Sequence, residues 1–174
     1  MFCLTLLFSL PKSNICQTAV FGGLCYYNRV EIRIQKVKAG AVLPSYAHLT
    51  DAGADLCSAE MVTIPASVAG SAGRGLVPTG IAMEIPEGYV GLVWDKSGLA
   101  TKKGITTIAG VIDSGYRGEI AVAVANLTNE PHTFKVGDKV AQILFQPVTQ
   151  AHFVETDILS EADRGEKGFG STGR

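Results

Sequence analysis

The sequence predicts an all-β fold, a jelly-roll-like β-barrel or sandwich of short strands with one short helix. Three observations support this prediction. From position 30 onward the chain consists of short runs rich in Val and Ile, bounded by Gly, Pro, Asn or Asp, which is typical of strands joined by turns. No long stretch places apolar residues at helical spacing. The length of 174 residues suits one domain with one core.

The first expected strand is 30–37, VEIRIQKV, in which apolar and polar residues alternate as in a strand with one buried face. Four longer runs are the other expected strands: 75–85, 88–95, 118–128 and 139–148. The helix is expected at 97–104, SGLATKKG, with Ser97 as its N-cap. Strand edges that remain exposed in such a fold favour formation of an oligomer.

The first 29 residues differ from the rest of the chain. They carry only two charges, Lys12 and Arg29, and show no clean alternation. Their apolar run of about ten residues is half of what spans a bilayer, and no Lys or Arg precedes it as in a secretory signal. We therefore expect residues 1–29 to be an extension outside the fold, either a targeting segment or the product of a start codon assigned too far upstream.

Charge and cysteine content exclude several kinds of partner. The chain has 15 Lys and Arg against 16 Asp and Glu, a formal net charge of -1, so no sequence-wide basic field exists to bind nucleic acid or an anionic membrane. Four cysteines form no CxxC pair, and three histidines show no ligand spacing, which argues against zinc. We expect a cytoplasmic protein without nucleic-acid or membrane partners, with organelle targeting through residues 1–29 as the alternative.

Glycines concentrate in four places: DAGADL at 51–56, DKSGLA at 95–100, IAGVIDSGYRGEI at 108–120, and the C-terminal tail. Glycine is poorly tolerated in strands unless a turn, a bulge or a close backbone approach requires it. These four segments are therefore the candidate ligand-binding segments.

The segment 108–120 has the sequence of a tight hairpin. Asp113, Ser114 and Gly115 lie between two apolar runs and are residue types that accept turn geometry. A hairpin that opens at its mouth leaves main-chain groups that can bind the edge of a base, and Tyr116 would add a flat surface. The alternative is a plain surface hairpin with a solvated aspartate.

Two other segments have the composition of phosphate sites. DKSGLA places a cation and a hydroxyl before the predicted helix, and helix N-termini bind phosphate; an ordinary helix cap is the alternative. The tail RGEKGFGSTGR, 164–174, combines basic side chains, hydroxyls and flexible backbone around Phe169, which could stack on a base. A frayed C-terminus is the alternative for the tail.

Five segments occur in a fixed order: DAGADLCSA, DKSGLA, GVIDSGYRGEI, VGDKVAQILF and RGEKGFGSTG. In this order they closely resemble the five motifs of the homotrimeric dUTP pyrophosphatases (dUTPases), over about residues 30–174. The resemblance implies a magnesium-dependent homotrimer that hydrolyses dUTP to dUMP and pyrophosphate, which lowers dUTP and supplies dUMP for thymidylate synthesis. It also implies a β domain over 30–160 and a mobile arm over 161–174 that completes a neighbouring active site.

The same resemblance assigns roles to residues of the third motif. Asp113 would orient the attacking water and take its proton. Tyr116 would pack against the deoxyribose and leave no room for a 2′-hydroxyl. The backbone of Gly110, Val111 and Ile112 would bind uracil and exclude a 5-methyl group.

The resemblance also implies contacts from the other motifs. Asp55 would lie near the magnesium ion and act through bound water. The remaining substrate-binding residues would be Lys96, Ser97, Gly98, Thr107, Gln142, Arg164, Phe169, Gly170, Ser171 and Thr172. Three positions depart from the family pattern: Lys96 stands where Arg is usual, Thr107 where bacterial relatives often have Asn, and Lys167 where Gly is frequent.

Two other functions are alternatives: a dCTP deaminase of the same fold and a catalytically silent nucleotide-binding trimer. A dCTP deaminase needs a glutamate base in the pocket and lacks the GFGSTG arm, and a catalytically silent nucleotide-binding trimer would not need Asp113 beside Tyr116. Outside the motifs, we expect Trp94 in the core or an interface and Cys57 as a small core residue. Arg117 would bind a phosphate or form a salt bridge between subunits.

Overall fold

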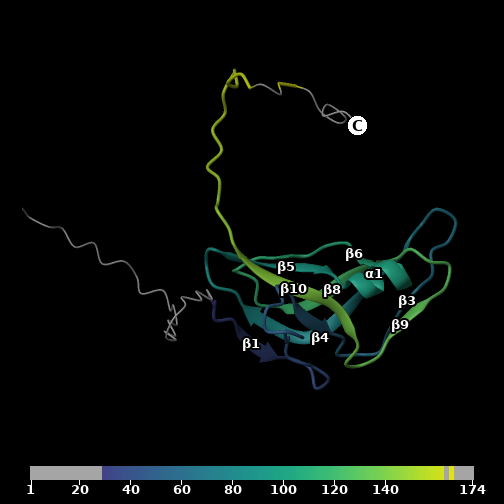
Figure 1. The fold of residues 1–174 in the computed structure, drawn as a ribbon. Helices are drawn as coiled ribbons and strands as arrows, with labels where there is room; N and C mark the ends of the chain where they lie inside the picture. Colours follow the sequence, from purple (N-terminus) through teal and green to yellow (C-terminus); the bar gives the residue numbers. More distant parts are fainter. Residues whose placement is uncertain (1–28, 163–164, 167–174) are drawn as a thin grey trace, which may run out of the picture.

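The computed structural model describes residues 29–162 and 165–166 (Figure 1). Residues 1–28 and the tail residues Arg164, Phe169, Gly170, Ser171 and Thr172 lie outside this range. Within it the strands are β1 Arg33–Lys36, β2 Ala54–Cys57, β3 Val62–Ile64, β4 Gly73–Glu84, β5 Tyr89–Asp95, β6 Ile105–Thr107, β7 Val111–Ile112, β8 Glu119–Asn126, β9 His132–Phe134 and β10 Lys139–Pro147, and the helix is α1 Ser97–Lys103. None of the described helical residues forms a segment long and apolar enough to cross a membrane.

Two four-stranded antiparallel sheets form the body of the domain. One has the strand order β1-β4-β8-β6 and the other β2-β10-β5-β7, while β3 and β9 form a small third sheet. Strands that are neighbours in a sheet are mostly distant in the chain, as in a jelly roll. The predicted all-β, jelly-roll-like fold with one short helix is confirmed.

Apolar side chains from both large sheets form the core. In β8, Ile120, Val122 and Val124 are almost completely buried at alternate positions, which is the alternation that places one face of a strand against the core. Ile143 of β10 is fully buried in the same cluster. Burial of each such side chain stabilises the fold by about 1.5–3 kcal/mol.

The longer strands lie where the sequence places them, and β1 is shorter than predicted. The alternation of exposed and half-buried residues runs from Arg29 to Gln35, but β1 covers only Arg33–Lys36, paired with the end of β4. Because β1 is the edge strand of its sheet, burial of one face extends further along the chain than the hydrogen-bonded ladder. Cys57 is buried on β2, as expected of a small core residue.

The predicted capping role of Ser97 is wrong. The N-cap of α1 is Lys96, which keeps an extended conformation (φ -83°, ψ 121°) and makes no side-chain capping bond. Ser97 is already inside the helix, and its carbonyl oxygen accepts a hydrogen bond of 2.7 Å from the Thr101 hydroxyl. The cap position therefore lies one residue before the serine. The helix ends at Gly104, whose φ of 62° is easily adopted by glycine.

The segment around Asp113 forms the predicted turn but not the predicted hairpin. The Tyr116 N–H donates to the Asp113 carbonyl oxygen at 3.1 Å. The strands on either side, however, belong to different sheets, because β7 pairs with β5 whereas β8 lies between β4 and β6. Both edges of β8 are thus occupied, which leaves no edge for β7. The turn connects the two large sheets instead.

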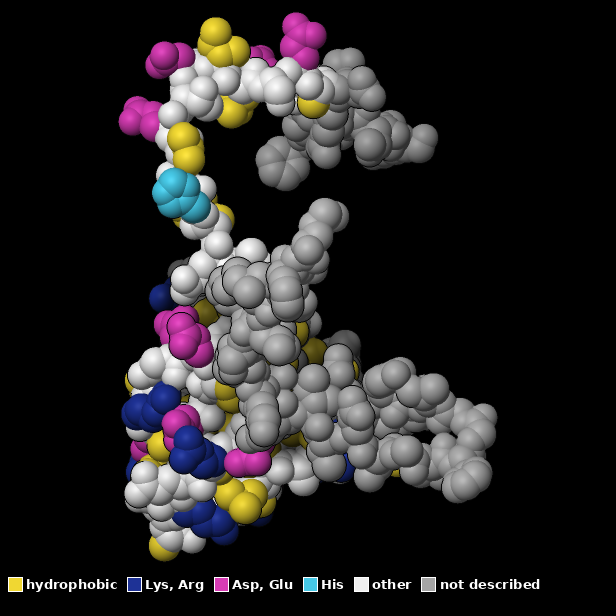
Figure 2. Space-filling view, turned by 90° about the vertical axis from the view of Figure 1, so that its left-hand side faces the viewer, with side chains coloured by type: hydrophobic (Ala, Val, Ile, Leu, Met, Phe, Trp, Pro, Cys, Tyr) yellow, Lys and Arg dark blue, Asp and Glu magenta, His cyan; other side chains and the backbone are white. Residues whose placement is uncertain are grey.

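After β10 the chain continues as an extended segment, residues 148–162, which leaves the body of the domain after the Val148 N–H donates to the Gly88 carbonyl oxygen at 2.9 Å (Figure 1). Figure 2 shows apolar and acidic side chains along this segment, which stands away from the sheets. Phe153 is 92% exposed, and Ile158 and Leu159 are similarly exposed. A segment with this many uncovered apolar side chains is typical of an interaction site.

Candidate active site

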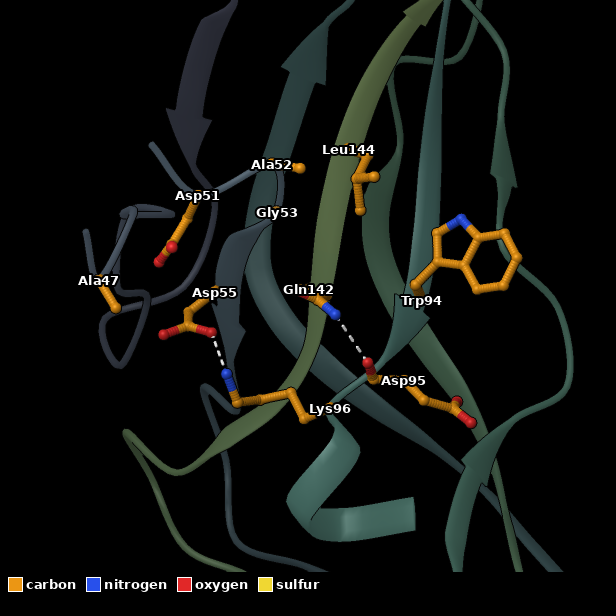
Figure 3. Close-up of a pocket in the computed structure, with 10 residues that line it drawn as sticks. All are labelled: Ala47, Asp51, Ala52, Gly53, Asp55, Trp94, Asp95, Lys96, Gln142 and Leu144. Carbon is orange, nitrogen blue, oxygen red and sulfur yellow. Dashed lines mark hydrogen bonds and ion pairs between the residues drawn. The ribbon is translucent and has the colours of Figure 1, made fainter. Parts of the chain in front are cut away.

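A pocket of about 370 Å³ lies at the Asp95 end of β5 (Figure 3). It is lined by Ala47, Asp51, Ala52, Gly53, Asp55, Trp94, Asp95, Lys96, Gln142 and Leu144. Three of these, Asp55, Lys96 and Gln142, are residues that the sequence assigns to the triphosphate or its metal ion. They come from three separate motifs and from β2, the residue after β5, and β10. The fold therefore brings these three predicted residues of one chain into one pocket, whereas Ser97, Gly98 and Thr107 do not line it.

Asp55 is a buried carboxylate held between two cations. It is 6% exposed, Lys96 Nζ donates to its Oδ1, and Lys139 Nζ lies 2.6 Å from its Oδ2. Burial by itself would raise the pKa of Asp55, but hydrogen bonds from Lys139 and Lys96 outweigh it and lower the pKa. Asp55 therefore stays ionised at neutral pH.

This environment fits a magnesium ion only in a water-mediated contact. Both Asp55 oxygens already accept from lysines, although each retains a lone pair for a hydrogen bond from water. Within residues 29–162 and 165–166, no three His, Cys, Asp or Glu side chains are grouped so that they could hold a metal. Magnesium normally keeps several waters and takes few protein ligands beside substrate phosphates, and the residues present fit that arrangement.

Asp95 organises the pocket, although sequence reasoning gave it no role of its own. Its carboxylate accepts hydrogen bonds from the Thr107 N–H, from the Thr107 hydroxyl at 2.7 Å and from the Thr106 hydroxyl at 2.8 Å. Its carbonyl oxygen accepts from Gln142 Nε2 at 2.9 Å (Figure 3). Burial raises the pKa of Asp95, but the bonds from Thr107 and Thr106 lower it overall. One residue thus connects β5, β6 and β10.

We expect Asp95→Asn to destabilise the fold by roughly 1–3 kcal/mol at pH 7 through loss of charge-assisted hydrogen bonds. Because the pKa of Asp95 is lower when folded, its contribution is present above the unfolded value near 3.8 and is lost as pH falls through the folded value. The difference in thermal unfolding midpoint between the Asp95→Asn variant and the wild type should therefore shrink below about pH 4. Thermal melts at pH 7 and pH 3, at one protein concentration, measure this difference.

The control for this prediction is Asp138→Asn. Asp138 is exposed, and its side chain accepts one main-chain hydrogen bond, from Lys135. We expect a smaller effect from this variant at pH 7. A destabilisation by Asp95→Asn that is independent of pH would contradict the account of Asp95.

Ser97 and Gly98 lie exposed at the start of α1, directly after Lys96. A Cβ placed on Gly98 would meet no atom within 4 Å. The glycine at this position is therefore not required by packing within the described chain.

The second cluster of predicted residues lies on β7 and the turn that follows it. Val93 N–H donates to the Gly110 carbonyl oxygen at 2.8 Å, and a Cβ on Gly110 would lie 2.4 Å from the Val93 carbonyl oxygen. Only glycine permits this approach. Among the described residues β7 pairs only with β5, so the other edge of Val111 and Ile112 has no strand partner there.

Asp113 and Tyr116 lie on this turn, with Tyr116 46% exposed. The Tyr116 hydroxyl donates to the Glu119 carbonyl oxygen at 2.9 Å. Arg117 Nη1 donates to the carbonyl oxygens of Ser114, at 2.6 Å, and Tyr116, at 2.9 Å. Arg117 thus braces the turn from within the chain.

Within one chain, the cluster of Asp55, Lys96 and Gln142 lies apart from the cluster on β7 and the turn that follows it. In the register of sheet strands, Gln142 lies opposite Trp94 and Ile112 lies opposite Gly91. Three residues along β5 correspond to about 10 Å, and β7 and β10 are two strand spacings of about 4.8 Å apart. The backbones of Ile112 and Gln142 are therefore roughly 14 Å apart, and Asp113 follows Ile112 in the chain.

Trp94 is not a core residue. It is 58% exposed on β5, and Figure 3 shows its indole ring turned away from Asp55. Val111 of β7 is similarly exposed. The predicted core environment of Trp94 is therefore wrong, and the interface stays a prediction.

Comparison with known proteins gives a family and a close relative. The family model of dUTPase matches residues 39–173. The deoxyuridine 5′-triphosphate nucleotidohydrolase of Leifsonia xyli subsp. xyli is 48% identical over 134 residues, which cover 75% of this chain and 85% of the relative.

Two solved structures have the same fold. The Staphylococcus bacteriophage 80alpha dUTPase with dUPNHPP is 28% identical, with a TM-score of 0.73 over 83% of this chain and 99% of that one. A mutant dUTPase from phage phi11 of S. aureus, described with a coordinated structural Mg(II) ion, is 24% identical, with a TM-score of 0.67 over 76% and 100% of the two chains. At this identity the second likeness concerns the fold.

Proposed function

The chain belongs to the dUTPase family, and on this premise we propose that it hydrolyses dUTP to dUMP and pyrophosphate. One observation carries the proposal for this chain: the edge of β7 that faces away from β5 adjoins the turn with Asp113 and Tyr116. A free strand edge offers both N–H and C=O groups. These complement the carbonyl, N–H and carbonyl groups along the edge of uracil.

Asp113 is the proposed general base. Its carboxylate takes a proton from a water molecule as the water oxygen attacks the α-phosphorus. The bond from the α-phosphorus to the oxygen that bridges to the β-phosphorus breaks, and pyrophosphate leaves. Tyr116 packs against the sugar, so its ring excludes a ribose 2′-hydroxyl.

Lys96, Ser97, Gly98 and Gln142 are the proposed phosphate contacts of the described chain. An ammonium group has three N–H donors, so Lys96 retains donors for phosphate after pairing with Asp55. A magnesium ion, when bound, neutralises charge on the triphosphate. Asp55 would hold a water of that ion.

We further propose that the active enzyme is a homotrimer. The separation of roughly 14 Å between Ile112 and Gln142 supports a site in which Asp113 of one copy meets the phosphate residues of another. Exposed Trp94 and the extended segment 148–162, with exposed Phe153, support extensive contacts between copies. In this assembly the arm 161–174 would add Arg164, Phe169, Gly170, Ser171 and Thr172 to a neighbouring site.

Pyrophosphate release from dUTP, dCTP, dTTP and UTP, each with and without a metal chelator, tests the function. We expect release from dUTP alone, and its loss on chelation. Ammonia release from dCTP would instead indicate the deaminase, and absence of turnover would indicate a silent nucleotide-binding protein. We also propose a cytoplasmic location and no nucleic-acid or membrane partners. The near-balanced charge of -1 supports the absence of such partners.

Gly98→Ala is expected to raise KM for dUTP by at least about tenfold without destabilising the fold. A Cβ at this position has open space around it, and alanine has a higher helix propensity than glycine. Loss of affinity would therefore report a clash with bound phosphate. Steady-state kinetics and a thermal melt measure the two effects.

The control is Lys102→Ala, an exposed position on the same helix. We expect this variant to keep the KM of the wild type. An unchanged KM for Gly98→Ala would remove Gly98 from the phosphate site.

A further inference from the structure

We propose that Lys139 is a positioning residue that, together with Lys96, fixes the orientation of the Asp55 carboxylate on the phosphate side of the site. This inference rests on the proposed dUTP hydrolysis for its effect on substrate. We call the contacts of Lys96 and Lys139 with the Asp55 carboxylate the clamp. These contacts lie within the described chain.

The two lysines hold different oxygens of the same carboxylate. Lys96 Nζ donates to Oδ1 of Asp55, and Lys139 Nζ lies 2.6 Å from Oδ2. The Asp55 side chain is 7% exposed, whereas Lys139 is 53% exposed. The lysines come from different parts of the chain: Lys96 lies between β5 and α1, and Lys139 is the first residue of β10. A carboxylate held at both oxygens has little freedom to rotate.

An irregularity in β10 makes this contact possible. Residues three apart in a regular strand, such as Lys139 and Gln142, point to opposite faces. The register shifts between Lys139 and Ala141, so that Lys139 lies opposite Cys57 while Gln142 lies opposite Asp55. The extra residue in β10 allows Lys139 to reach the side chain of Asp55. Bulges commonly redirect side chains in this way.

The chemistry of position 96 leaves one oxygen of Asp55 for a second cation. An arginine could bind both oxygens of one carboxylate with its planar fork. Lys96 is a point charge and contacts only one oxygen. Lys139 supplies the second contact, and the three side chains together carry a net charge of +1 beside the proposed triphosphate position.

The test uses the full chain with Lys139→Gln, Lys96→Arg and the double variant, and Lys135→Gln as the control. Lys135 is an exposed lysine that precedes the same strand. We measure binding of α,β-imido-dUTP by calorimetry, with and without magnesium. We expect Lys139→Gln to weaken binding by about tenfold. We also expect Lys96→Arg to restore most of the loss in the double variant, and Lys135→Gln to bind as wild type.

Two results of the binding measurements would overturn the proposal. Wild-type affinity of Lys139→Gln would show that the clamp does not position Asp55. No recovery in the double variant would show that Lys139 acts by its own charge rather than through Asp55.

A measurement without nucleotide distinguishes failure of the clamp from failure of the proposed function. A double-mutant cycle of Lys139→Gln and Asp55→Asn, read from thermal unfolding without nucleotide, measures the coupling of the pair directly. We expect the two changes to be non-additive. Additive changes would disprove the clamp, whereas non-additive changes in a protein that does not bind the dUTP analogue would disprove only the proposed function.

Discussion

Asp113→Asn is expected to reduce pyrophosphate release from dUTP by at least about 100-fold. Asparagine has the same shape as aspartate but cannot take a proton from water. The turn should persist, because the Asp113 carbonyl oxygen, which accepts from Tyr116, is unchanged by the substitution. Binding of α,β-imido-dUTP should therefore change by less than about tenfold, or about 1.4 kcal/mol. Single-turnover kinetics and calorimetry measure the two quantities.

Glu130→Gln is the matched control, since it neutralises an exposed carboxylate in the loop between β8 and β9. It should retain wild-type turnover. Near-normal turnover of the Asp113→Asn variant would show that another group activates the water.

Deletion of residues 164–174 is expected to lower turnover by about 100-fold or more while the oligomer still assembles. The deleted arm supplies Arg164, Phe169, Ser171 and Thr172 to the proposed neighbouring site. The described core, by contrast, is formed by residues between Ile32 and Phe145. Sedimentation and steady-state kinetics test assembly and turnover on the same sample.

Deletion of residues 1–28 serves as the control, because we expect it to leave turnover unchanged. This truncation also removes a terminal segment, but it removes no proposed site residue. We expect its turnover to equal that of the full chain. Undiminished turnover after removal of 164–174, or failure of that variant to fold, would contradict the proposed role of the arm.

The parts of the fold that depend on local pattern were predictable from sequence. Alternating apolar residues identified the long strands, because each has one face on the core. The short β7 was predicted as half of a hairpin, and this was wrong. Whether β8 has a free edge is decided by β4 and β6, and β4 is distant in the chain, so no local signal could exclude the hairpin.

The candidate site, like the fold, was only partly predictable from the sequence. The five motifs identified Asp55, Lys96 and Gln142, and the fold places them in one pocket. Sequence reasoning gave no role to Asp95, whose bonds to Thr106 and Thr107 depend on how β5 and β6 meet. It also missed the contact between Lys139 and Asp55, because the register shift in β10 has no signature in the residues themselves.

The turn that carries Asp113 joins one large sheet at β7 to the other at β8. The position of the proposed base, Asp113, therefore depends on how the two large sheets pack against each other. A cavity between the sheets, for example from Ile120→Ala, is therefore expected to shift the Asp113 carboxylate. The rate of dUTP hydrolysis should then decline at temperatures where the secondary structure is still intact. An activity assay would therefore report loss of packing between the two sheets.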